Sequence, residues 1–78
     1  MKFNPKKHRV LLPNKQITQA EWNKHLPDPL LKGQKVIVVK DQHEESLEKG
    51  YVRVKRKTGV STFNICHFTT IKGETLTV

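Results

Sequence analysis

Positively charged side chains gather in two runs, and these residues are the ones most able to act on a partner. Each run holds five of the 15 lysines and arginines, one within residues 2–15 and one within residues 49–57. Such a surface pairs with a phosphate backbone and releases counterions, which gives salt-sensitive, sequence-tolerant binding. A tyrosine in the second run could stack on a base. The residues predicted to bind nucleic acid are Lys6, Lys7, Arg9, Lys49, Tyr51, Arg53, Lys55 and Lys57.

These residues predict a non-enzymatic nucleic-acid-binding module that uses a basic hairpin face and a basic arm. The choice between DNA and RNA stays open. Lysine outnumbers arginine twelve to three, so the fork-shaped contacts of guanidinium groups are scarce. An excess of lysine on a small domain also serves solubility.

A stretch of opposite charge interrupts the basic pattern. Residues 41–48 hold four of the seven acidic residues: Asp41, Glu44, Glu45 and Glu48. They would repel phosphate near the basic hairpin, they could imitate nucleic-acid charge toward a basic protein, or they could solvate a loop. Bipolar charge on so small a chain also fits docking onto another protein. The alternative function is a small phage-type or mobile-element accessory protein that binds and inhibits or adapts a larger host protein.

The residue types that carry catalysis or hold metals show no working arrangement. Cys66 and His67 are adjacent, and neighbours in a strand point to opposite faces, so Cys66 is expected to be a small packing residue. The four histidines lack the short spacings of a zinc site. No glycine-rich phosphate loop or metalloprotease helix is present. We therefore expect no enzyme, no metal, no cofactor and no small-molecule substrate.

Size and composition set similar limits. The chain has 78 residues, 35% of them hydrophobic, and a formal net charge of +8. That is enough for one small domain with a shallow core. A single cysteine excludes an internal disulfide, and no apolar run approaches the roughly 18 residues of a membrane span. Because the first residues do not resemble a signal peptide, we expect a soluble, cytoplasmic protein without a membrane partner.

A β-hairpin is predicted to carry the second basic run. Alternating apolar residues over 51–57, followed by Thr58-Gly59, predict a strand and a tight turn. With residues 58–59 as the loop, apolar side chains face one another at two inner pairs, Val54–Phe63 and Val52–Ile65. The other face then carries the cations and one aromatic ring toward solvent, while Arg56 points inward.

One short helix is predicted over residues 18–26. Thr18 and Glu21 have the spacing of a capping box, and Ile17 and Trp22 have that of a hydrophobic staple. The prolines that follow end the helix after about two turns. Because so short a helix is unstable alone, Trp22 is expected to anchor it to the core.

The remaining segments complete the expected organisation. Residues 1–17 form a flexible basic arm with a short strand, and residues 18–78 form a single small β-barrel domain. A turn at Gly73-Glu74 would place Ile71 opposite Leu76 and Thr69 opposite Val78. An unpaired edge at Thr75–Val78 would allow a third function, self-assembly.

From residue 32 onward the pattern resembles a known fold. Lys32-Gly33, Val36-x-Val38, a charged loop and then Gly50-Tyr51-Val52 with its hairpin resemble an SH3-like small barrel of the KOW type, over roughly residues 32–72. Such barrels have five short, bent strands, and many bind RNA, DNA, or ribosomal and transcription proteins. The resemblance implies a 3₁₀ turn at Phe68-Thr69-Thr70-Ile71.

This chain departs from the pattern in its long acidic loop and in the helix and arm that precede the barrel. No binding residue is therefore transferred from the family. The predicted fold class is mostly β, a small SH3-like antiparallel barrel with one short N-terminal helix, and the alternative is an OB-like barrel.

Overall fold

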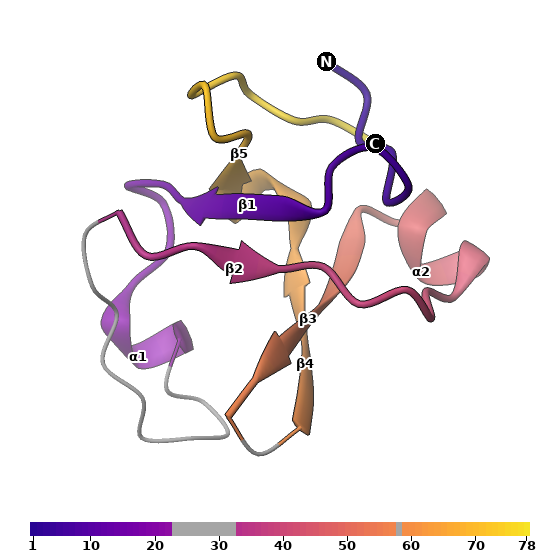
Figure 1. The fold of residues 1–78 in the computed structure, drawn as a ribbon, viewed down its shortest axis with the longest axis horizontal. Coiled ribbons are helices and arrows are strands. Elements are labelled where there is room, and N and C mark those ends of the chain that lie inside the picture. The colour runs from indigo at the N-terminus through magenta and orange to yellow at the C-terminus, as the bar shows by residue number, and fades with distance from the viewer. Residues whose placement is uncertain (23–32, 58) are drawn as a thin grey trace.

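Antiparallel strands dominate the computed structural model, which describes residues 1–22, 33–57 and 59–78 (Figure 1). The elements in chain order are β1 (Val10–Pro13), α1 (Gln19–Trp22), β2 (Val36–Ile37), α2 (Glu44–Glu48), β3 (Tyr51–Arg56), β4 (Gly59–Asn64), the 3₁₀ turn η1 (Ile65–His67) and β5 (Phe68–Thr69). The prediction of a mostly β fold is confirmed.

The strands form two small sheets. β1 lies in the middle of the first sheet, where it pairs antiparallel with β2 and β5. β3 and β4 form an antiparallel hairpin, and a single bridge between Val38 and Val54 connects this hairpin to the chain after β2. Within the described residues neither sheet closes into a barrel.

The hairpin register differs from the predicted one by two residues. Val52 pairs with Phe63, Val54 with Ser61, and the chain reverses between Arg56 and Gly59. The predicted pairs Val54–Phe63 and Val52–Ile65 are therefore wrong. Ile65 leaves the strand because the side-chain oxygen of Asn64 accepts a hydrogen bond from the Cys66 N–H and starts η1. A shift of two residues keeps every side chain on its predicted face.

One core joins the two sheets through aromatic rings. The Trp22 ring stacks on Phe63 at 5.3 Å between centroids, and Phe63 meets Phe68 edge-on at 5.8 Å. The guanidinium carbon of Arg56 lies 4.0 Å from the centre of the Trp22 ring, and Arg56 is 5% exposed. Its predicted inward direction is confirmed, and the anchoring role of Trp22 is explained by these contacts.

The start of the predicted helix is confirmed. The Thr18 hydroxyl accepts a hydrogen bond from the Glu21 N–H at 3.2 Å, which is one half of the capping box. Ile17 and Trp22 are both buried. The predicted continuation of the helix to residue 26 lies outside the described residues.

The first nine residues, which were expected to be a flexible arm, bond to the other end of the chain. The Phe3 N–H donates to the Thr77 carbonyl and the Thr77 N–H donates to the Met1 carbonyl, both at 2.8 Å. Phe3 also packs against the core. Backbone bonds to the other end of the chain thus hold this segment, and the short strand expected after it is β1, in the middle of a sheet.

The C-terminal turn is longer than predicted. Thr69 bridges Thr75, and Thr70 closes the turn because its hydroxyl accepts from the Glu74 N–H at 3.0 Å. The predicted pairs Ile71–Leu76 and Thr69–Val78 are wrong by three residues. An odd shift exchanges the two faces, so Ile71 is 56% exposed and Leu76 is 2% exposed.

The predicted 3₁₀ turn is also misplaced by three residues. The turn occupies Ile65–His67, and Phe68-Thr69 form β5. Cys66 lies on this turn and is exposed, so the expectation of a packing residue is wrong. In the part of the chain that the structure describes, no helix is long and apolar enough to cross a membrane.

Candidate nucleic-acid interface

The outward side of the hairpin carries the row of side chains predicted from the alternation of β3. Tyr51 is 43% exposed, Lys55 is exposed and Arg53 is half-buried. Val60 and Thr62 lie beside them on β4 and are exposed too. The row is basic and accessible, but Arg53 is not free to contact a partner fully.

The acidic segment binds Arg53. Its guanidinium Nη1 donates to the Asp41 carbonyl at 2.7 Å and lies 3.4 Å from the Asp41 carboxylate. The side chain of Gln42 accepts from the Arg53 N–H at 3.0 Å and donates to the Arg53 carbonyl at 2.8 Å. Residues 41 and 42 therefore lie against the middle of the basic row, where a carboxylate opposes phosphate.

Arg9 connects the N-terminal segment to the chain after β2. Its guanidinium donates to the carbonyls of Pro5, at 2.8 Å, and of Val38. With Arg9 and Arg53 on backbone carbonyls and Arg56 in the core, all three arginines of the chain stabilise the fold. The ten lysines of the described residues, by contrast, are all exposed.

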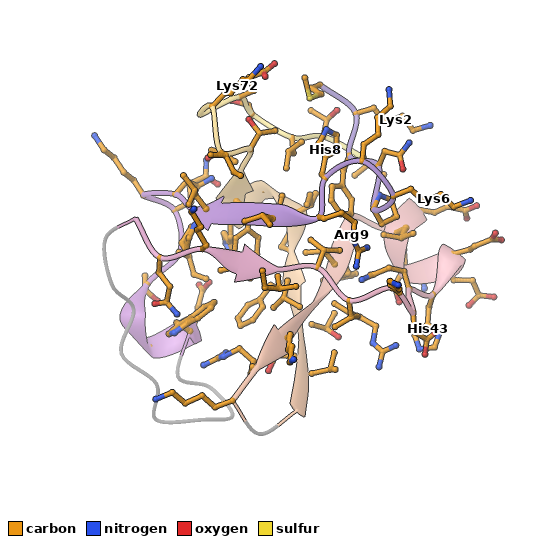
Figure 2. The ribbon with its side chains drawn as sticks, viewed as in Figure 1. Lys2, Lys6, His8, Arg9, His43 and Lys72 are labelled. Carbon is orange, nitrogen blue, oxygen red and sulfur yellow. The ribbon has the colours of Figure 1, made fainter. Side chains whose placement is uncertain are left out.

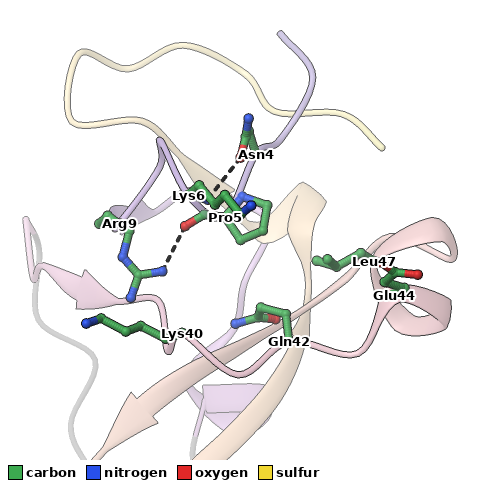
Figure 3. Close-up of a pocket in the computed structure, with 8 residues that line it drawn as sticks. All are labelled: Asn4, Pro5, Lys6, Arg9, Lys40, Gln42, Glu44 and Leu47. Carbon is green, nitrogen blue, oxygen red and sulfur yellow. Dashed lines mark hydrogen bonds between the residues drawn. The ribbon is translucent and has the colours of Figure 1, made fainter.

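One group of cations surrounds a hollow between the N-terminal segment and α2. Lys6, Arg9 and Lys40 line it together with Gln42 and Glu44, and its volume is about 710 Å³ (Figure 3). Figure 2 shows Lys2 and Lys6 projecting from the N-terminal segment. We call Lys6 and Lys40 the N-terminal lysine cluster. Sequence reasoning missed Lys40 because its position depends on the bridge that attaches the chain after β2 to the hairpin.

A second group lies at the turn end of the hairpin. Lys35, Lys55 and Lys57 line a hollow of about 170 Å³ with Trp22 and Arg56. We call these three lysines the hairpin lysine cluster. The structure thus brings together two predicted residues, Lys55 and Lys57, and adds Lys35, which no local signal in the sequence connects to the hairpin.

The other predicted residues do not join either cluster. Tyr51 lines a hollow with Glu44 and Glu48 of α2. Lys49 caps the C-terminus of α2 and is exposed, and Lys7 lines hollows on the side of His8. The eight predicted residues therefore lie on several parts of the surface, with acidic side chains between them.

A histidine and a carboxylate from distant parts of the sequence also meet. His67 Nδ1 lies 3.5 Å from Glu21 Oε2, a contact that joins η1 to α1. The pairing was not predicted because the two residues are far apart in sequence. Among the described residues, no group of three or more His, Cys, Asp or Glu side chains is placed to hold a metal ion.

Comparisons of this chain with protein-family models, with curated proteins and with solved structures find no match.

Proposed function

We propose that this chain is a non-enzymatic nucleic-acid-binding module that contacts the phosphate backbone through lysines. The observation that carries the proposal is the division between cation types: the ten described lysines are exposed while the arginines are held by the protein. Lysine is a point charge that attracts phosphate without a fixed fork geometry. Contacts to phosphate position a protein but carry no sequence information, so binding would be sequence-tolerant.

The hairpin lysine cluster is the proposed centre of the interface. Lys55 lies on the exposed face of β3 and Lys57 follows at the end of that strand. Lys35, directly before β2, lines the same hollow. Tyr51 lies at the other end of the row, where its 43% exposed ring is available for stacking on a base.

The test measures binding to fluorescently labelled poly-dT, poly-rU and a DNA duplex by anisotropy at several salt concentrations. The variant pair Lys35→Gln/Lys55→Gln is compared with Lys15→Gln/Lys72→Gln, which removes the same charge from exposed lysines outside the cluster. We expect the first pair to weaken binding more and to reduce the single-strand salt slope by about 1.4, which is about 0.7 for each phosphate contact.

Two outcomes would contradict the proposal. Tight binding that does not change with salt would exclude phosphate contacts as its basis. Equal losses for the two variant pairs would mean that net charge, rather than the hairpin lysine cluster, attracts the nucleic acid.

We also propose that the fold is an open relative of the SH3-like barrel of the KOW type. Support comes from the five short strands of the described residues, with a 3₁₀ turn directly before the last one, and from the Val38–Val54 bridge, which links the two sheets. An experimental structure in which a further strand separates β2 from β3 would contradict this assignment.

A further inference from the structure

We propose that the outer edge of β4 docks an extended acidic segment of a partner protein, which adds to the hairpin as a further strand. Strand addition uses main-chain hydrogen bonds for affinity and alternate side chains for specificity. The inference goes beyond nucleic-acid binding, because the docking groups are backbone atoms of β4 rather than lysine side chains.

Among the described residues, no backbone group bonds to the side of β4 that faces away from β3. On the opposite strand, Arg53 turns its backbone away from β4: its N–H donates to Gln42 at 3.0 Å and its carbonyl accepts from the Val39 N–H at 3.2 Å. Thr62 is paired with Arg53, and in an antiparallel pair of this kind both residues point their backbone groups outward. The same alternation applies to Val60. Within the described residues no strand other than β3 pairs with β4.

β4 also lacks the features that normally prevent strand addition. Its sequence, Gly-Val-Ser-Thr-Phe-Asn, contains no charge and no proline. Its residues pair one to one with β3 along the whole strand, without a bulge. Edge strands that lack lysine, proline and bulges are templates for another strand.

The opposite edge of the structure is covered by the chain itself. Thr69 in β5 bridges Thr75, and Lys2 bridges Thr77. The segment Thr75–Val78, which the sequence suggested as an unpaired edge for self-assembly, therefore already has partners. The molecule covers this edge with its own ends, whereas in the described residues only β3 pairs with β4.

Charge indicates what kind of strand fits the β4 edge. The chain carries a formal net charge of +8, and Lys55 lies directly beside Val60 on the outward face. An added strand would lie about 4.8 Å from β4 and about 10 Å from β3, where its acidic side chains can meet the lysine. A second copy of this chain would instead bring two positive charges of the same size together, which electrostatic repulsion opposes.

The test uses a synthetic peptide of alternating valine and glutamate and follows amide hydrogen exchange of the protein by NMR. We expect the peptide to slow exchange at Val60 and Thr62 by at least about tenfold. The amides of Ser61 and Phe63, which face β3, are internal references. A peptide with the same sequence but N-methylated at alternate residues cannot donate to β4, and we expect it not to bind.

Variants of the protein give a second readout. Thr62→Pro removes an outward N–H and should abolish peptide binding, whereas Thr62→Ala keeps it and should preserve binding. If the proline variant does not fold, the N-methylated peptide still tests whether binding needs hydrogen bonds to the β4 backbone, because the protein itself is unchanged in that experiment.

Four results would overturn the proposal: equal binding of the N-methylated peptide, equal binding when lysine replaces glutamate, binding without protection of Val60 and Thr62, or protection that depends on protein concentration alone. The last result would identify a second copy as the occupant. Failure of the protein to bind oligonucleotides would not affect this assay.

Discussion

The two sides of β3 place neighbouring cations in different roles. On the inner side, Arg56 is 5% exposed and lies over the Trp22 ring. On the outer side, Lys55 is exposed and Arg53 bonds to the acidic segment. Strand alternation therefore decides which cation enters the core and which lies on the outer face. A count of charges along the chain cannot make this distinction.

The largest effect should come from removing the aromatic group on the inner side. Trp22→Ala deletes the ring that stacks on Phe63 and supports Arg56, and we expect a loss of about 3–5 kcal/mol in the free energy of unfolding. Urea denaturation measures it. Tyr51→Ala, the aromatic control on the outer side, should cost less than about 0.5 kcal/mol. Similar losses for the two variants would contradict the distinction between the sides.

Replacing each of two neighbouring cations by alanine compares the two sides of β3 within one pair of residues. We expect Arg56→Ala to lower the free energy of unfolding by about 2 kcal/mol, because a desolvated cation–π contact is lost, and Lys55→Ala to change it by less than about 0.5 kcal/mol. Oligonucleotide affinity, measured where both variants are folded, should fall for Lys55→Ala and stay nearly constant for Arg56→Ala. The reverse pattern would place the interface on the inner side of β3 and would contradict the proposed role of Lys55.

A smaller loss is expected at the reversal that joins the two strands. Gly59 has a φ of +152°, a region that other residues avoid, and Gly59→Ala should cost about 1 kcal/mol or slightly more. Thermal unfolding provides the measurement, with Val60→Ala as the exposed neighbour for control. A stability change no larger for Gly59→Ala than for the control would indicate that the turn relaxes without strain.

The smallest effect concerns the contact between the acidic segment and the outer side. Arg53→Lys keeps the charge but loses the hydrogen bond to the Asp41 carbonyl, and we expect a cost of about 0.5–1 kcal/mol in chemical denaturation. Binding to poly-dT should change little, because the charge remains. A large loss of affinity with unchanged stability would instead make Arg53 a specific contact.

The two hairpins explain what the sequence could and could not predict. In β3 the register error was two residues, an even number, so Val52 and Val54 stayed inside and Lys55 stayed outside. In the tail, an error of three residues exchanged the faces of Ile71 and Leu76. The turn itself caused the error, because the Thr70 hydroxyl accepts a hydrogen bond from the Glu74 N–H and so closes a longer turn, whose length local propensity does not specify.

The candidate site was predictable as a set of cations but not as a surface. The sequence indicated Lys55 and Lys57, whose positions depend on one strand and its turn. It could not indicate Lys35 and Lys40, which reach their clusters because Val38 bridges Val54. Nor could it indicate that Arg9 donates hydrogen bonds to the carbonyls of Pro5 and Val38. Long-range pairing decides these positions, and no local pattern encodes it.

Mapping the bound surface tests the central claim most directly. In a ¹H–¹⁵N NMR titration with poly-dT, we expect the largest shift changes at Lys35 and Lys55, smaller ones at Lys40, and almost none at Lys15 or Val52. Changes that disappear at high salt would identify phosphate contacts. Two results would contradict the claim that exposed lysines form a nucleic-acid interface. One is a set of shift changes concentrated on the acidic helix α2, and the other is the absence of shift changes with poly-dT in excess at low salt.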